Sequence, residues 1–86
     1  MAKFKLIAKP VAIVDATQIT NDTFDADHPN PDHIVGVVYD PMQRCAFIDG
    51  HDGQMRADRG DWIIRGMHRE LSVCKADVFE AAYEPA

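Results

Sequence analysis

The chain has 86 residues, of which 47% are hydrophobic and 27% charged, and its formal net charge at pH 7 is −5. This length predicts one domain spanning residues 1–86, with a thin interior in which a deep catalytic cleft is difficult to build. The longest apolar run is only a few residues, which excludes a membrane helix, and the negative charge argues against direct binding to nucleic acid.

Short strands separated by turns are the pattern of the first half of the chain. Residues 3–6 alternate charged and apolar side chains, as an edge strand does, and residues 11–16 predict a second strand. A loop is expected at about residues 20–33, which contain two prolines and many short polar side chains. Residues 34–39 are rich in β-branched side chains and predict a strand, which a turn at 40–43 joins to a further strand at 44–48.

The second half repeats this pattern, with expected strands at 54–57, 61–65 and 70–74. Trp62 and Ile64 share one side of the segment Gly-Asp-Trp-Ile-Ile-Arg-Gly and are predicted to fill the core. Gly60 and Gly66 flank this strand and are expected to serve its turns, because glycine accepts a positive φ without strain.

The chain ends in a pattern typical of a short helix. Asp77 is expected at the N-cap, with Glu80 completing a capping box, and Phe79 and Tyr83 on one helical face together with Ala82. Pro85 is expected to end the helix. The sequence therefore predicts a mainly β (α+β) fold, a small antiparallel meander closing into a barrel or sandwich, with a short C-terminal helix.

Both ends of the chain resemble a widespread family of short proteins encoded by tailed bacteriophages and prophages, most without an assigned activity. The resemblance includes Lys-Pro-Val-Ala-Ile-Val-Asp-Ala-Thr-Gln at residues 9–18, and Met55, Arg56, Ala57, Gly60, Asp61, Trp62, Ile63, Ile64, Gly66, Glu70, Cys74, Lys75, Asp77, Phe79, Tyr83 and Glu84. Arg69 stands where the family usually has glycine. The resemblance implies a phage origin and a small β-rich fold, and it supplies no catalytic residue.

Metal binding and disulfide formation find little support in the spacing of histidines and cysteines. His28, His33, His51 and His68 lack the tight paired spacing of structural zinc sites, so they are interpreted as solvated turn residues. Cys45 and Cys74 are interpreted as thiols on strands of a cytosolic protein. No metal site or cofactor is predicted, although a small metal-binding protein remains an alternative.

Catalytic residues are also not predicted. Ser72 is the sole serine and lies in a strand pattern rather than in a nucleophile-elbow motif. The carboxylates cluster in a loop, where solvent would leave their acidity ordinary. We therefore expect a protein that is not an enzyme.

The loop at about residues 20–33, called here the acidic segment, is the most distinctive surface that the sequence predicts. No lysine or arginine occurs between Lys9 and Arg44. The carboxylates are expected to recognise a basic partner, with two aromatic side chains supplying contact area. The predicted partner-binding residues are Asp22, Phe24, Asp25, Asp27, Asp32, Tyr39 and Asp40. The alternative interpretation is a solvated loop without a specific partner.

The function predicted from these features is a phage accessory protein that binds and inhibits a host protein in the cytoplasm of the infected bacterium. One version is a DNA mimic that occupies the basic groove of a DNA-handling enzyme, such as a topoisomerase, nuclease or polymerase. The main alternative is a structural or assembly component of the virion. Neither nucleic acid nor membrane is an expected partner, and a homodimer formed by strand pairing is compatible with the pattern.

Overall fold

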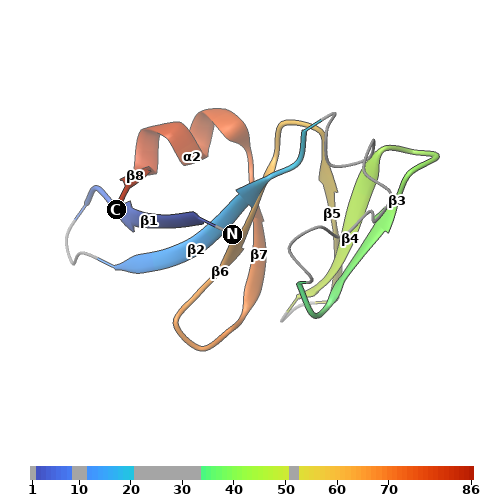
Figure 1. Cartoon of the computed structure of the whole chain (residues 1–86), viewed down its shortest axis with the longest axis horizontal. Coiled ribbons are helices and arrows are strands. Elements are labelled where there is room, and N and C mark those ends of the chain that lie inside the picture. Colours follow the sequence, from blue (N-terminus) through green and yellow to red (C-terminus); the bar gives the residue numbers. More distant parts are fainter. Residues whose placement is uncertain (1, 9–11, 21–33, 51–52) are drawn as a thin grey trace.

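In the part of the chain that the structure describes, the fold is mainly β, with two antiparallel sheets and one short helix, as a computed structural model shows (Figure 1). The structure describes residues 2–8, 12–20, 34–50 and 53–86. One sheet has the strand order β7-β6-β2-β1-β8 and the other has the order β3-β4-β5. The elements are β1 (Ala2–Leu6), β2 (Ile13–Gln18), β3 (Val37–Asp40), β4 (Cys45–Gly50), β5 (Gly53–Asp58), β6 (Trp62–Arg65), β7 (Leu71–Cys74), α2 (Ala76–Ala82) and β8 (Tyr83–Pro85).

The five-stranded sheet brings both ends of the chain together. β1 pairs with β2 on one side and with β8 on the other, so the expectation that residues 3–6 form an edge strand is wrong. The three-residue β8 takes the edge position, a common way of keeping an exposed edge short. β2 also pairs with β6, in the register Ala16↔Ile64, and β6 pairs with β7, in the register Trp62↔Cys74.

Side-chain alternation gives this sheet one face that packs against α2, which lies across it in Figure 1. Phe79 from the helix is 2% exposed, and its ring stacks on that of Trp62 with centroids 4.0 Å apart. Phe4 meets both rings edge-on, and Tyr83 stacks on Phe79 from the other side. Trp62 and Ile64 thus belong to a core cluster, as predicted, and Trp62 is half-buried.

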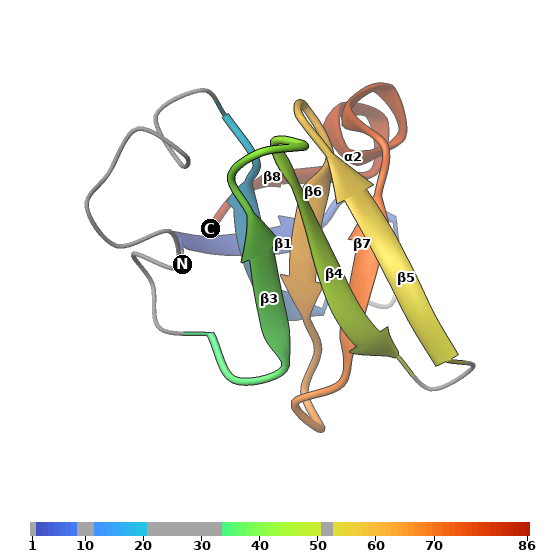
Figure 2. The same cartoon turned by 90° about the vertical axis from the view of Figure 1, so that its right-hand side faces the viewer.

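The opposite face of the sheet packs against the three-stranded sheet at its β6–β7 end (Figure 2). Ile63 is fully buried there, in one cluster with the buried Val37, Ala46 and Ile48 of the second sheet, against which Leu71 and Val73 of β7 also pack. Among the described residues, no hydrogen-bonded ladder joins the two sheets. The β1–β2 part of this face extends beyond the second sheet in Figure 1.

The second sheet is a meander of two hairpins. Its first strand begins at Val37, three residues later than expected, because Gly36 has φ +90° and forms a turn with Ile34 and Val35. The predicted turn after β3 is present. Asp40 closes this turn by accepting hydrogen bonds from the backbone N–H groups of Met42 and Gln43.

Two details of the predicted C-terminal helix are wrong. The N-cap residue is Lys75, which makes no side-chain cap, and Asp77 lies inside the first turn and accepts a bond from the N–H of Val78. The helix ends at Ala82 rather than at Pro85, because Tyr83–Pro85 pairs with β1 as strand β8. Pairing with an existing sheet thus replaced the last helical turn that the side-chain spacing had predicted.

The glycines that flank β6 serve its turns for different reasons. Gly60 has φ +95°, as predicted for a turn glycine. Gly66 has no positive φ, so that explanation is wrong for this residue; a Cβ atom at Gly66 would collide with the carboxylate of Glu70. In the same turn Arg69 has φ +63°, a conformation that glycine adopts without strain.

No described helix has the length and apolar character needed to span a membrane.

Candidate functional site

The predicted partner-binding residues fall mostly outside the described part of the chain: Asp22, Phe24, Asp25, Asp27 and Asp32. Tyr39 and Asp40 are described and lie at the end of β3. Tyr39 is half-buried against the core cluster between the two sheets, and the carboxylate of Asp40 closes the turn after β3. Both residues thus have structural roles, and their contact with a partner stays a prediction.

The structure brings together a different charged group, on the face of the five-stranded sheet that also carries Ile63. Lys3 is opposite Asp15 in the β1–β2 register, and Asp15 is opposite Arg65 in the β2–β6 register. Neighbouring residues in register point to the same face, so the three side chains form a row across three strands. The Asp15 carboxylate accepts hydrogen bonds from Lys3 Nζ at 2.8 Å and from an Arg65 guanidinium nitrogen, Nη2, at 3.0 Å.

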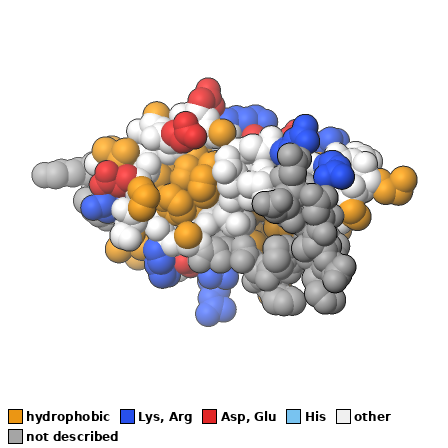
Figure 3. Space-filling model, turned by 45° about the horizontal axis from the view of Figure 1, so that its top comes forward, with side chains coloured by type: hydrophobic (Ala, Val, Ile, Leu, Met, Phe, Trp, Pro, Cys, Tyr) orange, Lys and Arg blue, Asp and Glu red, His pale blue; other side chains and the backbone are white. Residues whose placement is uncertain are grey.

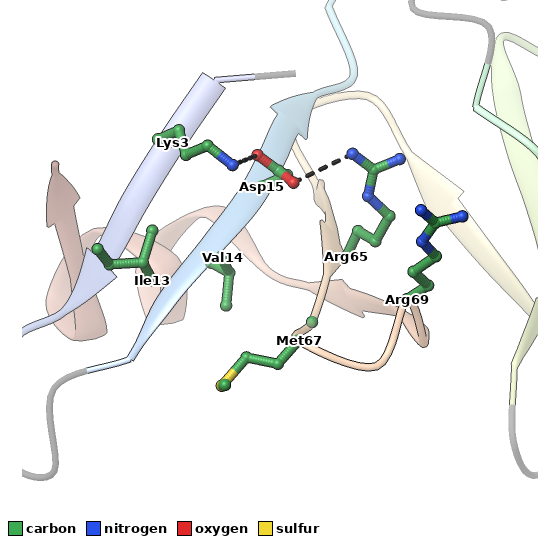
Figure 4. Close-up of a pocket in the computed structure, with 8 residues that line it drawn as sticks. Lys3, Ile13, Val14, Asp15, Arg65, Met67 and Arg69 are labelled. Atoms are coloured by element: carbon green, nitrogen blue, oxygen red, sulfur yellow. Dashed lines mark hydrogen bonds and ion pairs between the residues drawn. The ribbon is translucent and has the colours of Figure 1, made fainter.

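This row forms one side of an open groove of about 440 Å³, called here the basic groove. Its other lining residues come from β2 and from the β6–β7 turn: Ile13, Val14, Gly66, Met67 and Arg69. In Figure 4, Arg69 stands beside Arg65, and Met67 reaches from the turn back toward β2. The side chains of Ile13 and Met67 are 53% and 78% exposed, respectively. The groove therefore combines cationic groups with apolar side chains that solvent can reach.

The charges of the basic groove do not balance. Hydrogen bonds from Lys3 and then from Arg65 hold the pKa of Asp15 below its ordinary value, against the opposing effect of burial. Asp15 is therefore ionised at neutral pH. Three cationic side chains and this one carboxylate line the groove, and the Glu70 carboxylate lies beside the lining residue Gly66. An additional anion would be electrostatically favoured here, by an amount that depends on solvent screening.

Arg69 is the least expected member of the groove. Its left-handed φ of +63° costs a non-glycine residue about 1 kcal/mol. Its backbone N–H bonds to the Gly66 carbonyl, but its guanidinium makes no hydrogen bond or ion pair with any described residue. Sequence reasoning did not single out Arg69 as a site residue. The signal that could have done so is that an arginine stands where the family that this chain resembles usually has glycine.

Other described carboxylates are engaged in local contacts. Asp61, 5% exposed, accepts bonds from the backbone N–H of Asp58 and from Lys75 Nζ. Asp58 itself pairs with Arg56 at 2.8 Å. These contacts fix the β5–β6 turn, in which Gly60 donates a backbone bond to Ile19. The carboxylates of this turn thus have structural roles, and Asp58 also lines a second pocket together with Gln43, Arg44 and Arg59.

The described residues form neither a reactive thiol site nor a cluster of metal ligands. Cys45 and Cys74 are both free, and Cys45 is buried. Burial, followed by the charges of Asp77 and Asp61, raises the pKa of Cys74, which disfavours the reactive thiolate. Across residues 2–8, 12–20, 34–50 and 53–86, no group of three or more histidine, cysteine or acidic side chains could hold a metal ion.

Comparison with protein-family models, curated proteins and solved structures found no match to this chain.

Proposed function

We propose that this chain is a binding protein whose acidic segment engages a basic surface of another protein. The observation that carries the proposal is the division of charge along the chain. Residues 20–33 hold four aspartates and no lysine or arginine, whereas the described residues hold eight lysines and arginines against nine acidic residues. The acidic segment therefore accounts for most of the net charge of −5.

The ion pairs of the described residues support this assignment. Asp15, Asp58, Asp61 and Glu84 each lie within salt-bridge distance of a lysine or arginine. A basic partner that approached those carboxylates would compete with cations already in place. Around the acidic segment no lysine or arginine occurs in the sequence from 10 to 43, so this part of the chain has the stronger local negative charge.

The specific version of the proposal is a phage accessory protein that inhibits a host DNA-handling enzyme by occupying its basic groove, in the cytoplasm of the infected bacterium. It rests on the resemblance to phage proteins and on aspartates spaced two to five residues apart, at 22, 25, 27 and 32. Carboxylates spread over a surface can replace duplex phosphates, which lie about 3.4 Å apart along each strand.

For the scaffold that presents this segment, we infer a small β-sandwich. The support is that residues of both sheets, such as Ile63 and Ile48, belong to one core cluster.

The experiment is capture of host proteins on the immobilised chain, with release by duplex DNA and by salt. A DNA mimic predicts a captured protein that both duplex DNA and high salt release. The test variant changes Asp22, Asp25, Asp27 and Asp32 to asparagine and should lose the captured protein. The matched control carries the same charge change on exposed residues of the described part: Asp49→Asn, Asp77→Asn, Glu80→Gln and Glu84→Gln.

The outcomes separate the candidate functions. If the control loses the partner as fully as the test variant, overall charge rather than the acidic segment is responsible, and the proposal fails. If no protein is captured and the chain is found instead in purified virions at high copy, the structural alternative replaces it. A metal found by elemental analysis of the purified chain would favour the metal-binding alternative.

A further inference from the structure

The basic groove has donors that the fold leaves unused. Arg65 donates through one nitrogen to Asp15, and the Lys3 ammonium, 68% exposed, donates one bond to the same carboxylate. An arginine carries five N–H donors and a lysine three, so several remain on both residues. Arg69 adds a complete guanidinium that is bonded to no described residue, next to Arg65 in Figure 4.

The backbone of the β6–β7 turn gives a second, independent indication. Arg69 has φ +63° and is therefore strained where glycine would not be. The turn closes through bonds that do not need an arginine: the Arg69 N–H to the Gly66 carbonyl, and the Gly66 N–H to the Glu70 carbonyl. Packing does not explain the side chain either, because Arg69 is exposed. What the arginine adds is a positive charge at the basic groove.

We propose that the basic groove is a binding site for a small oxyanion, a phosphate or carboxylate group that carries a short apolar chain. Arg69 and the unused donors of Arg65 and Lys3 bind the oxyanion, and the exposed side chains of Ile13 and Met67 contact the apolar chain. Guanidinium groups suit this role because their planar N–H pairs match two oxygens of one anion.

This site is separate from the proposed protein-binding function, because it has the opposite charge and consists of described residues outside the acidic segment. The groove itself agrees with a ligand of mixed character, because the exposed side chains of Ile13 and Met67 lie beside its cationic side chains. On the face shown in Figure 3, hydrophobic side chains gather on the left half of the molecule, with acidic side chains above them and lysine and arginine side chains below. Exposed apolar groups beside cations favour an amphipathic anion over a fully hydrated one.

The test is titration of the ¹⁵N-labelled full chain with inorganic phosphate, butyl phosphate and butyrate at low ionic strength, followed by NMR. We expect saturable shifts of the backbone amides of β1, β2 and residues 65–69. Butyl phosphate should bind more tightly than inorganic phosphate, because Ile13 and Met67 contact only the butyl chain. The ratio between butyl phosphate and butyrate distinguishes a phosphate site from a carboxylate site.

Two variants and a control make the test specific. Arg69→Gly and Arg69→Asn both suit a left-handed backbone, so the fold should persist while the affinity for the preferred anion falls about tenfold. Arg56→Gln removes the same charge from an exposed arginine of the second sheet and should leave the affinity unchanged. The proposal is overturned if the shifts do not saturate, if they lie elsewhere, or if the two Arg69 variants bind as tightly as the unmodified chain.

Discussion

Replacing Phe79 by alanine tests whether α2 is held to the sheet by its aromatic contacts. Phe79 is 2% exposed and lies between Trp62 and Tyr83, with ring centroids 4.0 and 4.9 Å away. A buried phenylalanine truncated to alanine typically costs about 3–5 kcal/mol of unfolding free energy. Loss of the ring pairs is worth about 0.5–1.5 kcal/mol each and places this site toward the upper end of that range.

That loss is large for a chain of 86 residues, whose total free energy of unfolding is expected to be about 4–13 kcal/mol. With a urea m-value of about 1 kcal/mol per M, a loss of 4 kcal/mol lowers the unfolding midpoint by about 4 M. Phe79→Ala should therefore unfold at a urea concentration about 4 M lower than the unmodified chain does, and a total near the lower end of that range would leave it unfolded without denaturant. Phe79→Leu keeps part of the buried volume and should be intermediate.

Urea titration followed by far-ultraviolet circular dichroism measures these midpoints. The fluorescence of Trp62, the single tryptophan, serves as a second probe, although its native signal should change when the stacked ring is removed. Val78→Ala is the matched control, because Val78 is on the same helix and 55% exposed; it should cost less than about 0.5 kcal/mol. Equal midpoints for Phe79→Ala and Val78→Ala would refute the packing of α2 described above.

Three further predictions concern charge, backbone strain and thiol reactivity. Asp15→Asn should lower the free energy of unfolding at pH 7 by about 1 kcal/mol. Lys3 and Arg65 hold the pKa of Asp15 below 3.8, so this difference from the unmodified chain should persist above that pH. In acid unfolding titrations the difference should vanish as the pH falls through the lowered pKa. Gly60→Ala should lower the free energy of unfolding by about 1–2 kcal/mol, because φ is +95° at this position; no atom lies within 4 Å of the added Cβ, so the backbone conformation alone causes the loss. An unchanged thermal unfolding midpoint would contradict that backbone conformation. Cys74 should react with iodoacetamide at pH 8 more slowly than a free cysteine, because burial raises its pKa, and an equal rate would show an exposed thiol.

Local pattern was sufficient to predict the class of fold and most of its elements. β-branched runs and turn residues indicated β4, β5, β6 and β7 to within one or two residues, and the short helix was expected where α2 lies. The core role of Trp62 and Ile64 followed from alternation along one strand. Strand positions, turns and side-chain alternation depend on residues that are close together in the sequence, so the sequence alone predicts them.

Tertiary structure decided the strand order and everything that depends on it. The β1 strand has the alternation of an edge strand, but the C-terminal residues pair with it and so end the helix early. The basic groove likewise joins Asp15 to Lys3, 12 residues away, and to Arg65, 50 residues away. Periodicity assigns each residue a face of its own strand but does not say which strands are neighbours, because long-range pairing depends on how both sheets and the helix bury their apolar faces together.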